Sequence, residues 1–222
     1  MENLHPALAS VDVLGAPLTA SSRVIVILHG VGGNDDKLGA FAQRAIGRDA
    51  SVTILAPRSA FKIWFEGDLG APPSPTAPDL LRALGAVEWL VRQALEAGVP
   101  PDRITVSGFS QGACLALEHA MRAGRRYRGV MAMSGALLGM AAKRGDPRRA
   151  WGYSDATHLA GVRTKLSGHD DDAKVPLAII KRTQRQLAKL GAEVALRTEP
   201  GAMHGLMQAD CPVMGTLVEE GV

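Results

Sequence analysis

Short apolar runs rich in β-branched residues alternate along the chain with longer segments of helical character. The runs that predict buried strands are Val24–Leu28, Val52–Ala56, Ile104–Ser107, Gly129–Met133, Thr164–Ser167 and Val194–Thr198. The segments that predict helices are Leu38–Gly47, Pro78–Ala97, Ala113–Ala123 and Leu177–Leu190. Strands that alternate with helices are typical of a mostly parallel sheet with helices on both faces, so the pattern predicts an α/β fold.

Two long segments interrupt this alternation, and both are rich in turn-forming residues. Phe61–Thr76 contains glycines, prolines and serines, and Met140–Gly161 mixes charged residues with glycine. We expect both to be loops, and long loops at the carboxyl ends of parallel strands are where ligands bind in open α/β sheets. No repeat or linker divides the 222 residues, so we expect residues 1–222 to form a single domain.

Composition is that of an ordinary globular protein and excludes several functional classes. Hydrophobic residues make up 46% and charged residues 21%, and the net charge is +3. The basic residues lack interleaved aromatic residues, so we expect no nucleic-acid partner. No apolar run approaches the roughly 20 residues that span a bilayer, and the first residues lack the charged-then-apolar pattern of a signal peptide. We therefore expect no stable membrane insertion and a cytoplasmic location.

The chemistry of the chain is concentrated in the pentapeptide Gly108–Gly112, whose sequence GFSQG matches the pattern G-x-S-x-G. It stands between the predicted strand Ile104–Ser107 and the predicted helix Ala113–Ala123. A sharp strand-to-helix turn forces its apex residue into an unusual backbone conformation and crowds the residues on either side, so glycine fits at both ends. Such a turn presents Ser110 as a nucleophile. The alternative is an ordinary loop with two glycines and a capping serine.

A serine nucleophile needs a base that takes its proton and an acid that orients the base. Among six histidines, His204 lies in a glycine-flanked loop just beyond the last predicted strand. His119 falls inside a predicted helix, and His169 stands beside the aspartates, where it would break the order of acid before base. We therefore predict that His204 is the base.

The acid is expected in the turn after the predicted strand Thr164–Ser167, where three aspartates stand in a row. Counting forward from Gly168 selects Asp171, and counting back from the Val-Pro pair selects Asp172. We favour Asp172, because an extra residue is absorbed more easily at the exposed tip of the turn. A run of carboxylates could instead bind Ca²⁺ or Mg²⁺, but ligands from non-adjacent positions are missing, and we expect no metal site.

The oxyanion of an acyl-transfer intermediate is expected to meet two backbone N–H groups. Gln111, directly after the nucleophile, supplies the first. The glycine-rich segment Leu28–Asn34 supplies the second, with Val31 as the donor, because its glycines let the backbone approach the substrate closely. A nucleotide-binding loop is the alternative for this segment, but the spacing of its glycines fits neither common pattern.

These segments together resemble the phospholipase/carboxylesterase family of α/β-hydrolases, which includes acyl-protein thioesterases and small bacterial carboxylesterases. The resemblance runs from about residue 24 to residue 206. It rests on the segment Leu28–Asn34, Ala56-Pro57-Arg58, Trp64-Phe65, Gly108–Ala113, the aspartate turn and His204. It implies an α/β-hydrolase fold with a minimal lid, and hydrolysis of esters or thioesters of short to medium acyl chains without a cofactor.

The family pattern implies a role for each predicted site residue. It makes Ser110 the nucleophile, His204 the base, Asp172 or Asp171 the acid, and Val31 and Gln111 the oxyanion donors. Trp64 and Phe65 are expected to wall the acyl pocket, with core packing as the alternative for both. The chain departs from the family in the extra residue of its acid turn, and we predict no robust helix after His204. The resemblance leaves open whether the substrate is an ester, a thioester or a lysophospholipid, and whether the protein is a homodimer.

Two other functions stay open at this point. The chain could be a small-molecule binding module with a silent triad, since a fold alone does not establish a function. It could also be similar to dienelactone hydrolases, although these normally carry cysteine at the position that Ser110 occupies here. Labelling of Ser110 by a fluorophosphonate probe separates an active serine hydrolase from a binding module.

Overall fold

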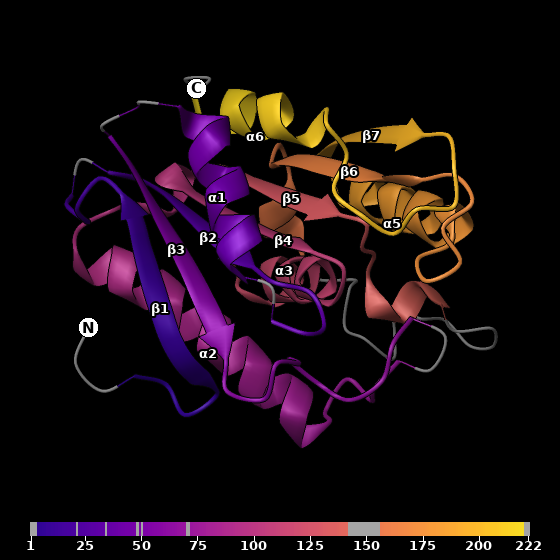
Figure 1. The fold of residues 1–222 in the computed structure, drawn as a ribbon, viewed down its shortest axis with the longest axis horizontal. Coiled ribbons are helices and arrows are strands. Elements are labelled where there is room, and N and C mark those ends of the chain that lie inside the picture. The colour runs from indigo at the N-terminus through magenta and orange to yellow at the C-terminus, as the bar shows by residue number, and fades with distance from the viewer. Residues whose placement is uncertain are drawn as a thin grey trace.

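A single seven-stranded sheet organises the computed structural model, which describes residues 4–20, 22–33, 35–47, 49, 51–69, 72–141 and 156–219. The strands are β1 (Leu8–Gly15), β2 (Arg23–Leu28), β3 (Val52–Ser59), β4 (Ile104–Phe109), β5 (Gly129–Met133), β6 (Arg163–His169) and β7 (Glu193–Glu199). Their order across the sheet is β1-β3-β2-β4-β5-β6-β7 (Figure 1). Only β1 runs antiparallel to its neighbour, so the prediction of a mostly parallel sheet is confirmed.

Helices cover both faces of this sheet, as the alternation of strands and helices predicts. The helices are α1 (Asp35–Ile46), α2 (Pro78–Glu96), α3 (Gln111–Arg122), α5 (Leu177–Lys189) and α6 (Asp210–Glu219), with short 3₁₀ turns between some elements. Side chains of a strand alternate between its two faces. In β2, Val24 and Val26 therefore join the core beneath α2, α3 and α5, whereas Ile25 and Ile27 join the core beneath α1 and α6. Both cores are mostly aliphatic, with Trp64, Phe65 and Tyr127 in the first and Phe41 in the second.

Two elements were not predicted from the sequence. The first is β1, an edge strand that pairs with β3 and whose residues are mostly half-buried or exposed. Because only part of such a strand joins the core, its apolar signal is weak.

The second is α6, which corrects the expectation that no robust helix follows His204. The pattern is poor because Pro212 and Gly215 interrupt it, but proline is tolerated in a first helical turn. Met214, Leu217 and Val218 are buried in the core shared with α1. Tertiary packing therefore outweighs a weak local propensity in this helix.

The carboxyl ends of the parallel strands meet at one edge of the sheet, on the right in Figure 1. The predicted loop 61–76 lies there and, apart from residues 70 and 71, is described as turns and irregular chain. Most of the predicted loop 140–161, including Trp151 and Tyr153, lies outside the described residues, as does Asn34. Among the described helices, none combines the length and the apolar character needed to cross a membrane.

Candidate active site

Ser110 stands at the apex of the sharp turn between the central strand β4 and helix α3. Its φ of 54° and ψ of −120° lie outside the regions that residues with side chains ordinarily adopt. A Cβ on Gly108 would lie 2.4 Å from the carbonyl of Gly112, and a Cβ on Gly112 would lie 2.2 Å from the carbonyl oxygen of Leu28. Both distances are too short for any side chain, so glycine is required on both sides of the strained serine.

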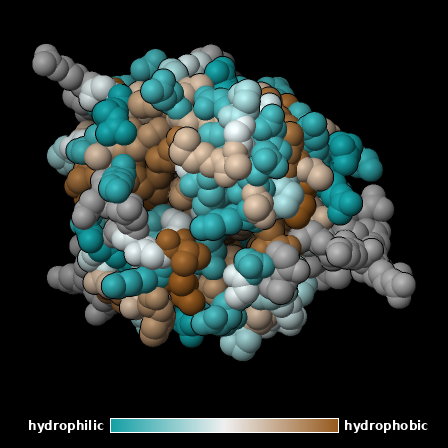
Figure 2. Space-filling view, turned by 45° about the vertical axis from the view of Figure 1, so that its right-hand side comes forward, coloured by the Kyte–Doolittle hydropathy of each residue, from teal (hydrophilic) through white to brown (hydrophobic). Residues whose placement is uncertain are grey.

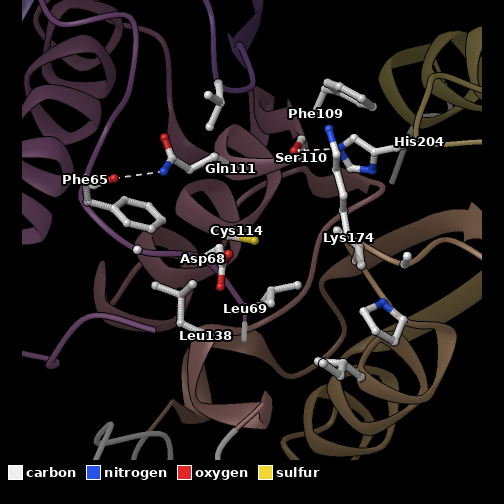
Figure 3. A pocket seen from close by; sticks show the side chains of 16 residues that line it. Phe65, Asp68, Leu69, Phe109, Ser110, Gln111, Cys114, Leu138, Lys174 and His204 are labelled. Atoms are coloured by element: carbon white, nitrogen blue, oxygen red, sulfur yellow. Dashed lines mark hydrogen bonds between the residues drawn. The ribbon is translucent and has the colours of Figure 1, made fainter. Parts of the chain in front are cut away.

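The ring of His204 bridges Ser110 and Asp172 (Figure 3 shows the contact with Ser110). His204 Nε2 lies 2.8 Å from Ser110 Oγ, and His204 Nδ1 lies 2.7 Å from Asp172 Oδ2. An ionised carboxylate can only accept, so the Nδ1–H group donates to Asp172 and Nε2 accepts from the serine hydroxyl. The three residues follow β4, β6 and β7, and the parallel sheet carries all three to one edge.

Asp172, rather than Asp171, is the carboxylate that reaches His204. Asp172 is only 3% exposed. Its Oδ1 accepts hydrogen bonds from the backbone N–H groups of Lys174 at 2.8 Å and Val175 at 3.1 Å. Burial raises the pKa of the Asp172 carboxyl, but the hydrogen bonds from His204 and the backbone together hold it below its ordinary value. The side chain is therefore a fixed anion at neutral pH.

The remaining aspartates of the turn join it to the loop that carries His204. The backbone N–H of Asp170 donates to the carbonyl of Glu199 at 3.0 Å, and that of Asp171 donates to the carbonyl of Gly201 at 3.1 Å. The N–H of Gly201 donates in return to Asp170 Oδ1 at 2.8 Å. The side chain of Asp171 is exposed. The extra residue of this turn thus lies at its tip, bound to the neighbouring loop.

Two further residues that the sequence analysis did not single out hold the His204 loop in place. Ser134, directly after β5, has a φ of 49°, and its hydroxyl donates to the carbonyl of Gly205 at 3.1 Å. The ring of Phe109 lies beside that of His204, with 5.1 Å between the ring centroids. The only signal for Ser134 in the sequence is its position at the end of a strand.

The predicted oxyanion donors lie on the two loops that meet beside Ser110. Gln111 begins α3, so its backbone N–H has no carbonyl partner in the preceding turn. Val31 lies in the loop after β2, is 65% exposed and lines the same cavity as Ser110. This loop passes close to the serine, since a Cβ on Gly30 would lie 3.2 Å from the Cβ of Ser110. In the described part of the chain, neither N–H group donates to a backbone carbonyl.

The side chain of Gln111 has a role that the sequence analysis missed. Its Oε1 accepts the backbone N–H of Trp64 at 2.8 Å, and its Nε2 donates to the carbonyl of Phe65 at 2.8 Å (Figure 3). Trp64 stacks on His29 at a centroid distance of 4.7 Å and donates its indole N–H to the carbonyl of His29 at 2.8 Å. The loop after β3 is thereby fastened to both predicted oxyanion loops.

A cavity of about 580 Å³ opens in front of Ser110. Its apolar lining includes Phe65, Leu69, Phe109, Leu138, Val175 and Ile179. In Figure 2, brown hydrophobic side chains gather beside a hollow on a face that is otherwise largely hydrophilic. Phe65 lines the cavity, whereas Trp64 is not among its lining residues. Trp64 is only 3% exposed, so its side chain supports the loop from behind, which is the packing alternative considered for it.

Cys114 also lines the cavity, one helical turn beyond Ser110. Burial raises the pKa of its thiol to about 12, so the thiol is neutral and not a ready nucleophile at neutral pH. Among the described residues, no group of three or more His, Cys, Asp or Glu side chains could hold a metal ion. Ser110 and His204 form the hydrogen-bonded pair of a hydroxyl and an imidazole in this cavity.

The sheet, its helices and the serine turn define an α/β-hydrolase. The structure resembles a phospholipase/carboxylesterase from Dyadobacter fermentans, with a TM-score of 0.81, 24% identity and 98% of each chain covered. It also resembles a carboxylesterase from Bacillus cereus, with a TM-score of 0.71, 18% identity, and coverage of 94% of this chain and 92% of that one. At these identities, the likeness establishes the fold.

The family follows from the sequence. A model of the phospholipase/carboxylesterase family matches residues 13–214, and the chain belongs to this family. An acyl-protein thioesterase 1 from Saccharomyces cerevisiae is 29% identical over 140 residues, which cover 55% of this chain and 61% of the relative. An acyl-protein thioesterase 1 from Schizosaccharomyces pombe is 38% identical over 58 residues, which cover 26% of each protein. The matched part is thus less than two thirds of the length of these relatives.

Proposed function

We propose that the protein is a serine hydrolase that cleaves carboxylic esters or thioesters of short to medium acyl chains. The observation that carries this proposal is the continuous hydrogen-bonded chain from Ser110 through His204 to Asp172, which opens onto a largely apolar cavity. Membership of the phospholipase/carboxylesterase family supports it. Acyl-protein thioesterases among the relatives support a thioester as well as an ester substrate.

In the first half of the reaction, Ser110 Oγ attacks the acyl carbonyl carbon while His204 Nε2 takes the hydroxyl proton. Asp172 accepts the Nδ1–H bond throughout, which fixes the tautomer of the ring and stabilises the imidazolium that forms. The backbone N–H groups of Val31 and Gln111 bind the oxyanion, and each contributes on the order of 3 kcal/mol in the transition state. The tetrahedral intermediate then collapses, His204 returns the proton to the leaving group, and an acyl-enzyme remains.

In the second half, water takes the place of the serine hydroxyl. His204 accepts a proton from the water as it attacks the acyl carbon, and the same oxyanion donors bind the second intermediate. The bond to Ser110 Oγ breaks, His204 returns the proton to the serine, and the carboxylic acid leaves. Every proton transfer in this scheme uses a group that the structure contains, so no cofactor is needed.

The proposal is tested with Ser110→Ala and a fluorophosphonate probe. The wild-type protein should become labelled and should hydrolyse a p-nitrophenyl acyl ester, whereas Ser110→Ala should be unlabelled and should lose at least about three orders of magnitude in kcat. A matched control is Ser74→Ala, which removes a hydroxyl from an exposed position outside the cavity lining and should keep both labelling and turnover.

Circular dichroism should show that all three proteins are folded. Absence of labelling in folded wild-type protein would favour a binding module, and full turnover by Ser110→Ala would exclude this serine as the nucleophile.

A further inference from the structure

Lys174 gives the cavity a charge that the proposed reaction does not use. Besides His204, the residues with ionisable acidic or basic side chains in the lining are Asp68, Cys114 and Lys174, and the thiol is neutral. Asp68 already has a polar interaction within the molecule. Lys174 makes no side-chain hydrogen bond or ion pair within the described part of the chain. A cation with no internal partner therefore lines a largely apolar cavity.

The backbone of Lys174 is held by the carboxylate that contacts His204. Asp172 accepts the backbone N–H of Lys174 through one oxygen and the ring of His204 through the other. Lys174 and His204 both line the cavity, and Figure 3 shows them on the same side of it. Phe65 and Gln111 lie on the opposite side. The ammonium group thus belongs to the His204 side of the reacting atoms.

The His204 side of the cavity matters because the leaving group separates from the acyl group there. In the proposed reaction His204 returns its proton to the leaving group, so the leaving group must stand against the imidazole. The apolar side chains around Phe65 and Leu69 remain for the acyl chain. Resting on the proposed function, we propose that Lys174 selects esters or thioesters whose leaving alcohol or thiol carries an anionic group, a carboxylate or a phosphate.

The chemistry of lysine suits this task. An ammonium on a flexible stem binds carboxylate or phosphate as a point charge and adapts to different distances from the scissile bond. Because Lys174 is exposed at the cavity rim, water and salt screen the attraction. The preference is therefore a matter of a few-fold in kcat/KM, as for other exposed charge pairs, and it should weaken as ionic strength rises.

The test uses a pair of esters that differ in the charge of the leaving group alone. The anionic member is para-carboxymethylphenyl butyrate, and the neutral member is para-carbamoylmethylphenyl butyrate, which has nearly the same shape. Lys174→Gln should lower the ratio of kcat/KM for the anionic over the neutral ester by about two- to fivefold. Lys181→Gln is the matched control, because it removes the same charge from an exposed position of α5 that does not line the cavity. Its ratio should equal that of the wild type.

Two further comparisons test which anionic group Lys174 prefers and on which side of the scissile bond the anion lies. A phosphate in place of the carboxylate on the same phenol should respond to Lys174→Gln in the same direction. The phenyl monoester of glutaric acid, compared with phenyl pentanoate, carries the anion on the acyl side, and a response confined to that pair would overturn the leaving-group assignment. An unchanged ratio in Lys174→Gln, or an equal change in Lys181→Gln, would also overturn it while leaving ester hydrolysis intact. Failure of the wild type to hydrolyse any of these esters would instead refute the proposed function, and this inference with it.

Discussion

Asp171 and Asp172 are adjacent and chemically identical, yet the backbone gives them different surroundings. The N–H of Asp171 is bound to Gly201, which leaves its carboxylate in solvent, whereas Asp172 is buried against His204. A shift of one residue along the turn determines which of the two carboxylates can contact His204. The hydrogen bonds of the turn therefore decide which carboxylate contacts His204.

We expect Asp172→Asn to lower kcat by about three to four orders of magnitude, because an amide can donate to Nδ1 and hold His204 in the wrong tautomer. Asp171→Asn is the matched control and should change kcat by no more than about twofold, as for other exposed substitutions. Both values come from steady-state hydrolysis of one acyl ester. Small and equal losses in the two variants would show that neither aspartate orients His204.

Several site residues could be predicted from the sequence because their signals are local. Ser110 is marked by two glycines that sterics demand, and His204 by its place after the last strand. The acid could only be narrowed to two candidates, because the choice depends on contacts with Gly201 that are distant in sequence. The roles of the Gln111 and Trp64 side chains depend in the same way on loops that meet only in the folded chain.

At the level of elements, a glycine sets how closely α6 approaches α1. A Cβ on Gly215 would lie 2.6 Å from the carbonyl oxygen of Ala45, a backbone atom that cannot turn aside. The two helices can pack at their present distance only while this position has no side chain. Glycine, which weakens α6 as an isolated helix, therefore strengthens its packing, and this is why local propensity failed to predict the helix.

We expect Gly215→Ala to lower the free energy of unfolding by about 1–3 kcal/mol, because the added methyl group forces the two helices apart. Gly85→Ala is the matched control, since Gly85 also lies inside a helix but faces the end of the His5 side chain, which can move away. That variant should be as stable as the wild type or gain up to about 1 kcal/mol from helix propensity. Urea unfolding measures both, and equal effects would contradict this account of the α1–α6 contact.

Over the whole molecule, the strand segments and the mostly parallel sheet could be predicted from the alternation of strands and helices, whereas the order of the strands across the sheet was not predicted. All six predicted strands are present. Five of them are central and largely buried, and most of these read as continuous apolar runs, whereas β7 is an edge strand of exposed and half-buried residues. The edge strand β1 and the terminal helix α6 carry weaker patterns and were missed. A single domain, a cytoplasmic location and a homodimer stay predictions.

Acid stability should depend on His119, which is buried in α3 against the hydroxyl of Tyr127 at 2.9 Å. Burial lowers the pKa of His119 to about 4, with a smaller opposing effect of Glu88. Between that value and the ordinary value near 6.5, the unfolded chain binds a proton that the folded protein does not. The contribution of neutral His119 to the free energy of unfolding is therefore fully present above about pH 6.5 and is lost as the pH falls toward 4.

We expect the free energy of unfolding of the wild type to fall by about 2 kcal/mol more than that of His119→Gln between about pH 6.5 and pH 4.5. Glutamine keeps a hydrogen-bonding group near Tyr127 but does not titrate. Urea unfolding at several pH values gives both curves. Parallel curves for the two proteins would show that His119 is not the group responsible.

The hydrogen bonds that tie the acid turn to the loop after β7 have a mechanical consequence. Asp170, Asp171 and Gly201 fasten the support of Asp172 to the support of His204. The end of β5 joins this pair of loops to the serine turn, because Ser134 donates to Gly205 and Met133 accepts the N–H of Ser110. The two loops therefore form one hydrogen-bonded support for Asp172 and His204. A change in either loop is passed to the other, so the distance between carboxylate and imidazole depends on residues that contact neither group.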